Sequence, residues 1–170
     1  GETSEAIFMN SGYVFNNAEE AKARFAGELD GYLYSRYGNP TVTMFEERMA
    51  LNDEAEACFA TATGMAAVFA SFMSYLKSGD HIVSSRSLFG SCYYILNQVL
   101  PSYGITTYLI DGTDLSQWKK HITNKTKCIF LESPSNPTME IVDIDSVVKI
   151  AHHHNVLVIV DNILASPVLQ

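Results

Sequence analysis

One segment of the chain is suited to bind a phosphate. Residues 60–67 read ATATGMAA, and we expect them to pass from a strand into a helix. The first backbone N–H groups of a helix, together with the helix dipole, attract an anion. Gly64 lets the backbone approach such a ligand closely, and Thr61 and Thr63 supply hydroxyl groups. Many strand-to-helix turns contain Gly and Thr, so an ordinary turn stays open when this segment is considered alone.

A second segment ends on a carboxylate. Residues 156–161 read VLVIVD, an apolar strand that finishes at Asp161. Asp161 could cap a helix or form a turn, or it could pair with the protonated nitrogen of a pyridine ring. A negative charge beside that nitrogen keeps its proton on, because an opposite charge favours the charged form. The metal-binding carboxylate of an ATPase would look similar, but the chain has neither a G-x-x-x-x-G-K-[ST] phosphate loop nor a G-x-G-x-x-G dinucleotide motif.

Three further residues could complete such a pocket. The segment LESPSNPT (131–138) has two prolines around Asn136, so it is either a simple tight turn or a rigid support for the Asn136 amide. Glu132 ends its own strand, and it could hold the residues that contact a ligand. Phe89 is a core aromatic unless a planar heterocycle is present, in which case it can stack on the ring.

The remaining pattern predicts an α/β fold. Strands are expected at 56–61, 81–85, 105–110, 127–132 and 156–161, and helices at 18–29, 40–51, 64–76, 89–100, 115–121 and 143–154. Alternating strands and helices imply right-handed crossovers and a mostly parallel sheet with helices on both faces. The helix at 64–76 is apolar nearly all round and is expected to be buried, and the helix at 89–100 is expected to end at Pro101. Ligands of such sheets bind beyond the carboxyl ends of the strands.

Composition narrows the classes of partner. The 170 residues are 47% hydrophobic and 18% charged with a net charge of −8, which fits a globular protein and argues against nucleic acid as a partner. No apolar run reaches the ~18 residues of a membrane span, and we expect a cytoplasmic protein. Cys58, Cys92 and Cys128 are expected to be buried reduced thiols. The run His152–His154 is expected to be solvated and to bind no metal.

Five motifs in order resemble one enzyme family. YSRYGNPT, ATATGMAA, SLFGSCY, LESPSNPT and VDN together are similar to the Cys/Met-metabolism (trans-sulfuration) family of pyridoxal-phosphate-dependent enzymes, over almost the whole chain. The resemblance implies fold type I, the large domain of an aspartate-aminotransferase-like enzyme, and pyridoxal 5'-phosphate as cofactor. It also implies γ-replacement on O-succinylhomoserine or another O-acylhomoserine with a sulfur nucleophile, giving homocysteine for methionine biosynthesis. A cystathionine γ-synthase or a cystathionine γ- or β-lyase is the alternative within the family.

The resemblance also assigns residues to the cofactor. It places the phosphate at the backbone of Gly64 and Met65, beside Thr63, and the neighbouring subunit's phosphate at Tyr34 and Arg36. The pocket then requires a homodimer or homotetramer. At the ring it implies stacking by Phe89, a bond from Asn136 on the ring-hydroxyl side, a bond from Asp161 to the pyridine nitrogen, and support from Glu132.

Two positions depart from the commonest family pattern. Phe89 stands where many members have Tyr, so it keeps the stacking face and lacks the hydroxyl. Ile163 stands where many members have Thr. Both departures favour the sulfhydrylase branch.

The resemblance further implies that the Schiff-base lysine and the substrate-carboxylate arginine are missing. Lys149 and the other lysines match no family motif, so no catalytic residue is assigned. We expect a fragment with an N-terminal arm, helix and inter-subunit loop at 1–40 and the first part of the cofactor domain at 41–170. Such a fragment is expected to be inactive alone, and a folding or dimerisation module is the non-enzymatic alternative.

Overall fold

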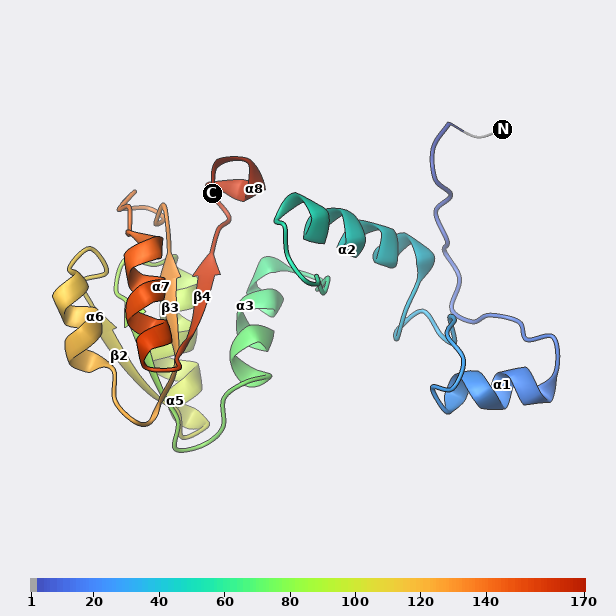
Figure 1. Cartoon of the computed structure of the whole chain (residues 1–170), viewed down its shortest axis with the longest axis horizontal. Coiled ribbons are helices and arrows are strands. Elements are labelled where there is room, and N and C mark those ends of the chain that lie inside the picture. Colours follow the sequence, from blue (N-terminus) through green and yellow to red (C-terminus); the bar gives the residue numbers. More distant parts are fainter. Residues whose placement is uncertain (1–2) are drawn as a thin grey trace. The chain divides into compact units, whose positions relative to one another are not determined.

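The structure is a computed structural model that describes residues 3–170. The chain forms two compact units, one up to Ala60 and one from Thr61 to Gln170 (Figure 1). Each unit is described by itself. The predicted division at residue 40 stays a prediction about the complete protein.

The first unit contains helices α1 (Ala18–Phe25) and α2 (Pro40–Asn52). The predicted helix starts are confirmed, because the Asn17 side chain accepts a hydrogen bond from Glu20 N and Asn39 accepts one from Thr41 N. Helix α1 ends earlier than expected, and Gly27 just beyond it has a φ of +71° that glycine adopts without strain. Neither helix contains a buried residue.

The second unit is built on a parallel sheet. Strands β1 (His81–Ser85), β2 (Thr106–Ile110), β3 (Thr126–Glu132) and β4 (Leu157–Asp161) lie in the order β2-β1-β3-β4. Every pairing between them is parallel, which confirms the expected sheet. The central strand β3 is almost entirely buried, whereas the edge strands β2 and β4 are partly exposed.

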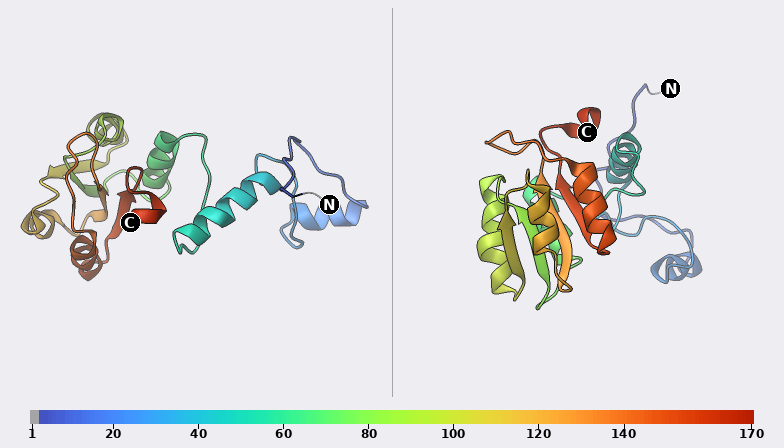
Figure 2. Two further views of the ribbon diagram at one scale, coloured as in Figure 1. Left: turned by 90° about the horizontal axis from the view of Figure 1, so that it is seen from above. Right: turned by 60° about the vertical axis from the view of Figure 1, so that its left-hand side comes forward.

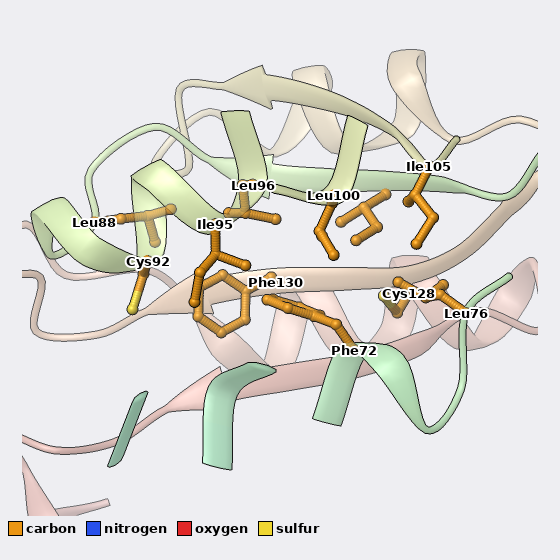
Figure 3. Close-up of a cluster of buried hydrophobic side chains, with 11 residues drawn as sticks. Phe72, Leu76, Leu88, Cys92, Ile95, Leu96, Leu100, Ile105, Cys128 and Phe130 are labelled. Atoms are coloured by element: carbon orange, nitrogen blue, oxygen red, sulfur yellow. The ribbon is translucent and has the colours of Figure 1, made fainter. Parts of the chain in front are cut away.

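Helices cover both faces of this sheet (Figure 2). On one face α3 and the α4–η1–α5 segment enclose a core that includes Phe72, Leu96 and Phe130 (Figure 3). On the other face α6 and α7 enclose a second core around Trp118 and Val147. The helices of this unit are α3 (Gly64–Met73), α4 (Gly90–Tyr94), the π-helix η1 (Ile95–Val99), α5 (Leu100–Ser102), α6 (Leu115–His121), α7 (Ile144–His153) and α8 (Ser166–Leu169).

Two predictions about the region before the sheet are wrong. Residues 56–61 form no strand, and the Ala60 N–H donates to the Glu46 carboxylate at 2.7 Å instead of to a neighbouring strand. Helix α3 is not buried all round, since Phe72 is its only buried residue while Ala67 and Ala70 are exposed. Only one side of α3 packs on the sheet within this unit, and an apolar sequence does not by itself supply a second covering layer.

Pro101 does not end its helix. The π-helix η1 comes first, and the Leu100 N–H donates to the Ile95 carbonyl five residues back. A wide turn of this kind changes the backbone pairing just before a proline, which has no N–H and would clash with the carbonyl of an ordinary α-turn. The helix therefore continues through Pro101 to Ser102.

Cysteine and histidine residues are mostly placed as expected. Cys92 and Cys128 are buried free thiols, whereas Cys58 is only half-buried. The histidines of the run at 152–154 are exposed at the end of α7. Among residues 3–170, no group of His, Cys, Asp and Glu side chains is arranged to hold a metal ion. Within the same residues, no helix has the length and apolar character to cross a membrane.

Candidate active site at the carboxyl ends of β3 and β4

A cavity of about 560 Å³ lies in the second unit, between the start of α3 and the carboxyl ends of β3 and β4. The register of the sheet explains its position, because Glu132 and Asp161 are paired as the last residues of these neighbouring strands. The structure brings together seven residues that the sequence singled out, and all of them line the cavity: Thr63, Gly64, Met65, Phe89, Glu132, Asn136 and Asp161.

One end of the cavity is formed by the first turn of α3. Thr63 caps this helix, with its hydroxyl accepting a hydrogen bond from Ala66 N at 3.1 Å, and Thr61 donates to the Thr63 carbonyl at 2.8 Å. Gly64 and Met65 are the first helical residues, where backbone N–H groups lack partners inside the helix. A Cβ added to Gly64 would meet no heavy atom within 4 Å, so packing in this unit does not require glycine there. This end can therefore bind an anion closely through backbone donors.

The opposite end carries two carboxylates. The Oδ1 atom of Asp161 accepts a hydrogen bond from Ile163 N at 3.2 Å, and Oδ2 lies 3.8 Å from the Cys92 sulfur. Glu132 lies beside Asp161 and is almost fully buried, with 1% of its surface exposed. The lining contains no lysine or arginine. This end therefore favours a cationic group on a ligand.

Glu132 connects two parts of the site. Its Oε2 accepts a hydrogen bond from Phe89 N at 2.6 Å, and its Oε1 accepts one from Asn136 N at 3.1 Å. Burial raises the pKa of the Glu132 carboxyl, the two N–H donors oppose that rise, and the charge of Asp161 adds to it. The buried carboxylate thus holds the loop before α4 and the loop after β3 together.

The Phe89 and Asn136 side chains have less protection from solvent. Phe89 is 43% exposed at the start of α4, so its side chain is accessible for stacking. Asn136 is half-buried between Pro134 and Pro137 in the loop after β3. Together with the two polar ends, these residues fit a flat ligand that is anionic at one end and cationic at the other, which is the charge pattern of pyridoxal phosphate with a protonated ring nitrogen.

Two predicted residues lie in the other unit. The Arg36 guanidinium lies over the rings of Tyr34 at 5.1 Å and Tyr37 at 5.4 Å, which holds an exposed cation on an aromatic platform. Neither Tyr34 nor Arg36 lines the cavity. Their role at the pocket of a neighbouring subunit stays a prediction.

Sequence reasoning missed Cys92 as a neighbour of the site. The residue lies in SLFGSCY, three positions after Phe89, and this spacing is typical of one helical face. The contact with Asp161 joins residues 69 positions apart in the chain. No local pattern encodes such a pairing, so it emerges only in the folded unit.

Similar solved structures define the class of protein. A Campylobacter jejuni crystal structure that carries a pyridoxyl-lysine phosphate superposes with a TM-score of 0.92 at 35% identity, covering 97% of this chain and 41% of that chain. Cystathionine gamma-lyase from Lactobacillus plantarum gives a TM-score of 0.89 at 35% identity, over 98% of this chain and 41% of that chain. The fold is therefore that of the pyridoxal-phosphate-dependent enzymes, as predicted.

The sequence comparison identifies the family. The family model described as "Cys/Met metabolism PLP-dependent enzyme" matches residues 1–170, and the chain belongs to this family. An O-succinylhomoserine sulfhydrylase from Mycobacterium tuberculosis is 51% identical over 99% of this chain and 42% of its own length. One from Pseudomonas aeruginosa is 47% identical over 100% of this chain and 42% of its length. The chain thus spans less than half the length of these relatives.

Proposed function

We propose that the complete protein is a pyridoxal-phosphate-dependent sulfhydrylase that acts on an O-acylhomoserine, with O-succinylhomoserine as the first candidate. The observation that carries this proposal is the cavity with the α3 N-terminus at one end and Asp161 at the other. The 51% identity to an O-succinylhomoserine sulfhydrylase supports the substrate. The L-methionine gamma-lyase of Treponema denticola is less similar, at 40% over 100% of this chain and 43% of its length.

Each residue of the cavity then has a physical task. The N–H groups of Gly64 and Met65 bind the phosphate, and Thr63 fixes the helix turn that presents them. Phe89 covers one face of the ring, and Asn136 bonds the ring-hydroxyl side. Asp161 holds a proton on the ring nitrogen, because its negative charge stabilises the cationic ring. When bound, the cofactor supplies an electron sink for the amino-acid substrate.

The proposed reaction exchanges an oxygen for a sulfur at the substrate's γ-carbon. The bond between that carbon and the acyl oxygen breaks, and succinate leaves with the electron pair. A bond to the sulfur nucleophile forms, and the nucleophile loses its proton, which gives homocysteine when the nucleophile is sulfide. Phe89 carries no hydroxyl, so proton transfer falls to other groups of the complete protein. This reaction would belong to trans-sulfuration in methionine biosynthesis, in the cytoplasm.

The proposal includes a homodimer or homotetramer. Tyr34 and Arg36 are assigned to the phosphate of a neighbouring subunit, and the fork of an arginine matches phosphate geometry. This assignment is compatible with a cavity whose own lining contains no basic side chain. A phosphate with only backbone donors and hydroxyls would gain from a cation supplied in this way.

Binding of pyridoxal phosphate to the full-length protein tests the pocket. Removing Asp161 takes away a charge-assisted bond, so Asp161→Ala should raise the dissociation constant roughly tenfold or more. Asp145→Ala is the matched control, because Asp145 is an exposed carboxylate in the first turn of α7. Equal affinity in wild type and Asp161→Ala would refute the assignment of Asp161 to the ring.

Product analysis tests the reaction. With O-succinylhomoserine and sulfide, the full-length protein should release homocysteine and succinate in equal amounts. With methionine alone, it should release little keto acid. Rapid breakdown of methionine without homocysteine formation would instead favour the lyase branch, to which the Treponema denticola relative belongs.

A further inference from the structure

We propose that Cys92 is a positioning residue for the Asp161 carboxylate: its thiol donates a hydrogen bond to Oδ2 and fixes the direction in which the carboxylate faces the ligand. The inference deepens the proposed function and rests on it for the identity of that ligand. It assigns Cys92 no covalent chemistry.

The Cys92 side chain is confined on all sides. It lies in α4 with 1% of its surface exposed, and it belongs to the same core as Leu88, Ile95 and Phe130 (Figure 3). Its sulfur nevertheless meets a polar atom, the Oδ2 of Asp161 at 3.8 Å. The other neighbours of this thiol in the core are apolar. The Asp161 carboxylate is therefore the polar partner of the sulfur.

The contact completes the support of Asp161. The other oxygen, Oδ1, accepts the hydrogen bond from Ile163 N at 3.2 Å. Each oxygen of the carboxylate is thus held by a different segment, one by α4 and one by the chain after β4. A carboxylate fixed at both oxygens cannot rotate freely about its Cβ–Cγ bond, so its remaining lone pairs keep one direction.

The thiol acts as a donor at neutral pH. Burial, followed by the negative charges of Asp161 and Glu132, raises the pKa of Cys92 to about 12. The sulfur therefore keeps its proton and donates it in a hydrogen bond to Oδ2 of Asp161. The same protonation makes the residue a poor nucleophile, in agreement with a positioning role.

Helix α4 thereby positions two groups that would contact the proposed ring, the Phe89 side chain and the Asp161 carboxylate. Its first residues follow Phe89, whose N–H is held by Glu132, and its third residue is Cys92. The stacking face and the carboxylate are thus set by one short helix against the ends of β3 and β4. A change at Cys92 is expected to loosen the carboxylate end while leaving the phosphate end intact.

Infrared spectroscopy of the cofactor-free full-length protein tests the hydrogen bond itself. The S–H stretching band of Cys92, identified by subtracting the spectrum of Cys92→Ala, should lie at lower frequency than that of Cys128. In Asp161→Ala the Cys92 band should move to higher frequency, and the Cys128 band should stay. A Cys92 band that does not respond to Asp161→Ala would overturn the proposal, whatever the protein binds.

Cofactor binding tests the consequence. Cys92→Ala should weaken binding of pyridoxal phosphate about threefold, the effect of losing one modest hydrogen bond, and should lower the protonation of an isotope-labelled ring nitrogen observed by NMR. Cys92→Ser keeps a donor and should restore the nitrogen signal. Cys128→Ala removes another buried thiol and is the matched control.

The two proposals can fail separately. Equal losses of affinity in Cys92→Ala and Cys128→Ala, with an unchanged nitrogen signal, would mean that Cys92 acts only through packing and would overturn the inference. If wild type binds no pyridoxal phosphate at all, the proposed function fails. The infrared shift in the cofactor-free protein then still decides whether Cys92 holds Asp161.

Discussion

The two units of the chain differ in how they use apolar residues. In the second unit Phe72, Trp118 and Val147 are completely buried in cores on the two faces of the sheet. In the first unit α1 and α2 contain no fully buried residue, and Met9 and Val14 are more than nine-tenths exposed. The second unit therefore has its own hydrophobic cores on both faces of its sheet, whereas the described part of the first unit has no such core and leaves large apolar side chains exposed. This contrast supports the proposed homo-oligomer.

Truncation of a large side chain should give the largest difference in stability loss between the two units. Trp118 is fully buried, and its Nε1 donates to the Gly112 carbonyl at 2.9 Å. Trp118→Ala should therefore lower the free energy of unfolding by about 3–5 kcal/mol. Phe45→Ala, in α2 and 53% exposed, should change it by less than about 0.5 kcal/mol. Urea unfolding followed by circular dichroism measures both, and equal losses would erase the contrast.

The rate of thiol labelling should show the next largest difference between the two units. The pKa of Cys92 rises from 9.0 to about 12 through burial and the nearby carboxylates, and burial likewise raises that of Cys128 to about 12. A rise of three pKa units lowers the fraction of ionised thiolate about a thousandfold, which corresponds to about 4 kcal/mol in the free energy of ionisation. Cys58, half-buried in the first unit, should be alkylated first in the native protein. Mass spectrometry of timed samples checks the order, and early labelling of Cys92 would contradict the buried site.

Removal of a helix cap should produce a smaller difference in stability between the two units. Asp143 caps α7 by accepting hydrogen bonds from Ser146 N at 3.0 Å and from the Ser146 hydroxyl at 2.7 Å. Since α7 packs into a core, Asp143→Ala should cost about 1 kcal/mol of global stability. Asn17→Ala removes the corresponding cap of α1 and should leave the global unfolding transition in place, because α1 contains no fully buried residue. A global loss as large as that of Asp143→Ala would show that α1 belongs to the cooperative unit.

The pH dependence of stability should have opposite signs in the two units. The folded state raises the pKa of Glu132 above its ordinary 4.5 through burial, so it binds this proton more tightly than the unfolded chain. Stability contributed by this group is present below 4.5 and is lost as the pH rises through the folded pKa. The free energy of unfolding of Glu132→Gln should therefore increase relative to that of wild type as the pH rises from 4 towards neutrality.

Glu20 in the first unit provides the opposite case. The Asn16 N–H lowers its pKa, so its contribution is present above 4.5 and is lost as the pH falls. The stability of Glu20→Gln should therefore decrease relative to that of wild type as the pH rises through that range. Global unfolding curves at a series of pH values measure the slope for Glu132, and the helix content of α1 observed by NMR over the same pH range measures that for Glu20. Slopes of the same sign would contradict the assigned environments.

Much of the second unit could be predicted from its sequence. Four apolar strands and the alternation of strands and helices were predicted correctly because each has a local cause. The polar residues at the strand ends were also found, since parallel strands end at one edge of a sheet. Local patterns thus predicted most of the elements of the second unit and the residues that line its cavity.

The errors concern what the rest of the molecule supplies. Residues 56–61 have strand-like composition, but a strand needs a partner, and Glu46 takes the Ala60 N–H instead. The sequence of α3 predicted burial on all sides, although its own unit covers one side. The contact between Cys92 and Asp161 depends on packing between α4 and β4, so neither segment encodes it alone.

The central claim is that the α3 N-terminus binds the phosphate of the ligand whose ring faces Asp161, and one binding comparison tests the phosphate end of this claim directly. The dissociation constants of pyridoxal phosphate and of pyridoxal, which lacks the phosphate, would be measured for the full-length wild type and Gly64→Val. Because side-chain atoms at Gly64 would displace the phosphate from its N–H donors, binding of pyridoxal phosphate should weaken roughly tenfold or more, and binding of pyridoxal should stay unchanged. Unchanged binding of both compounds, or an equal loss for both, would contradict the account.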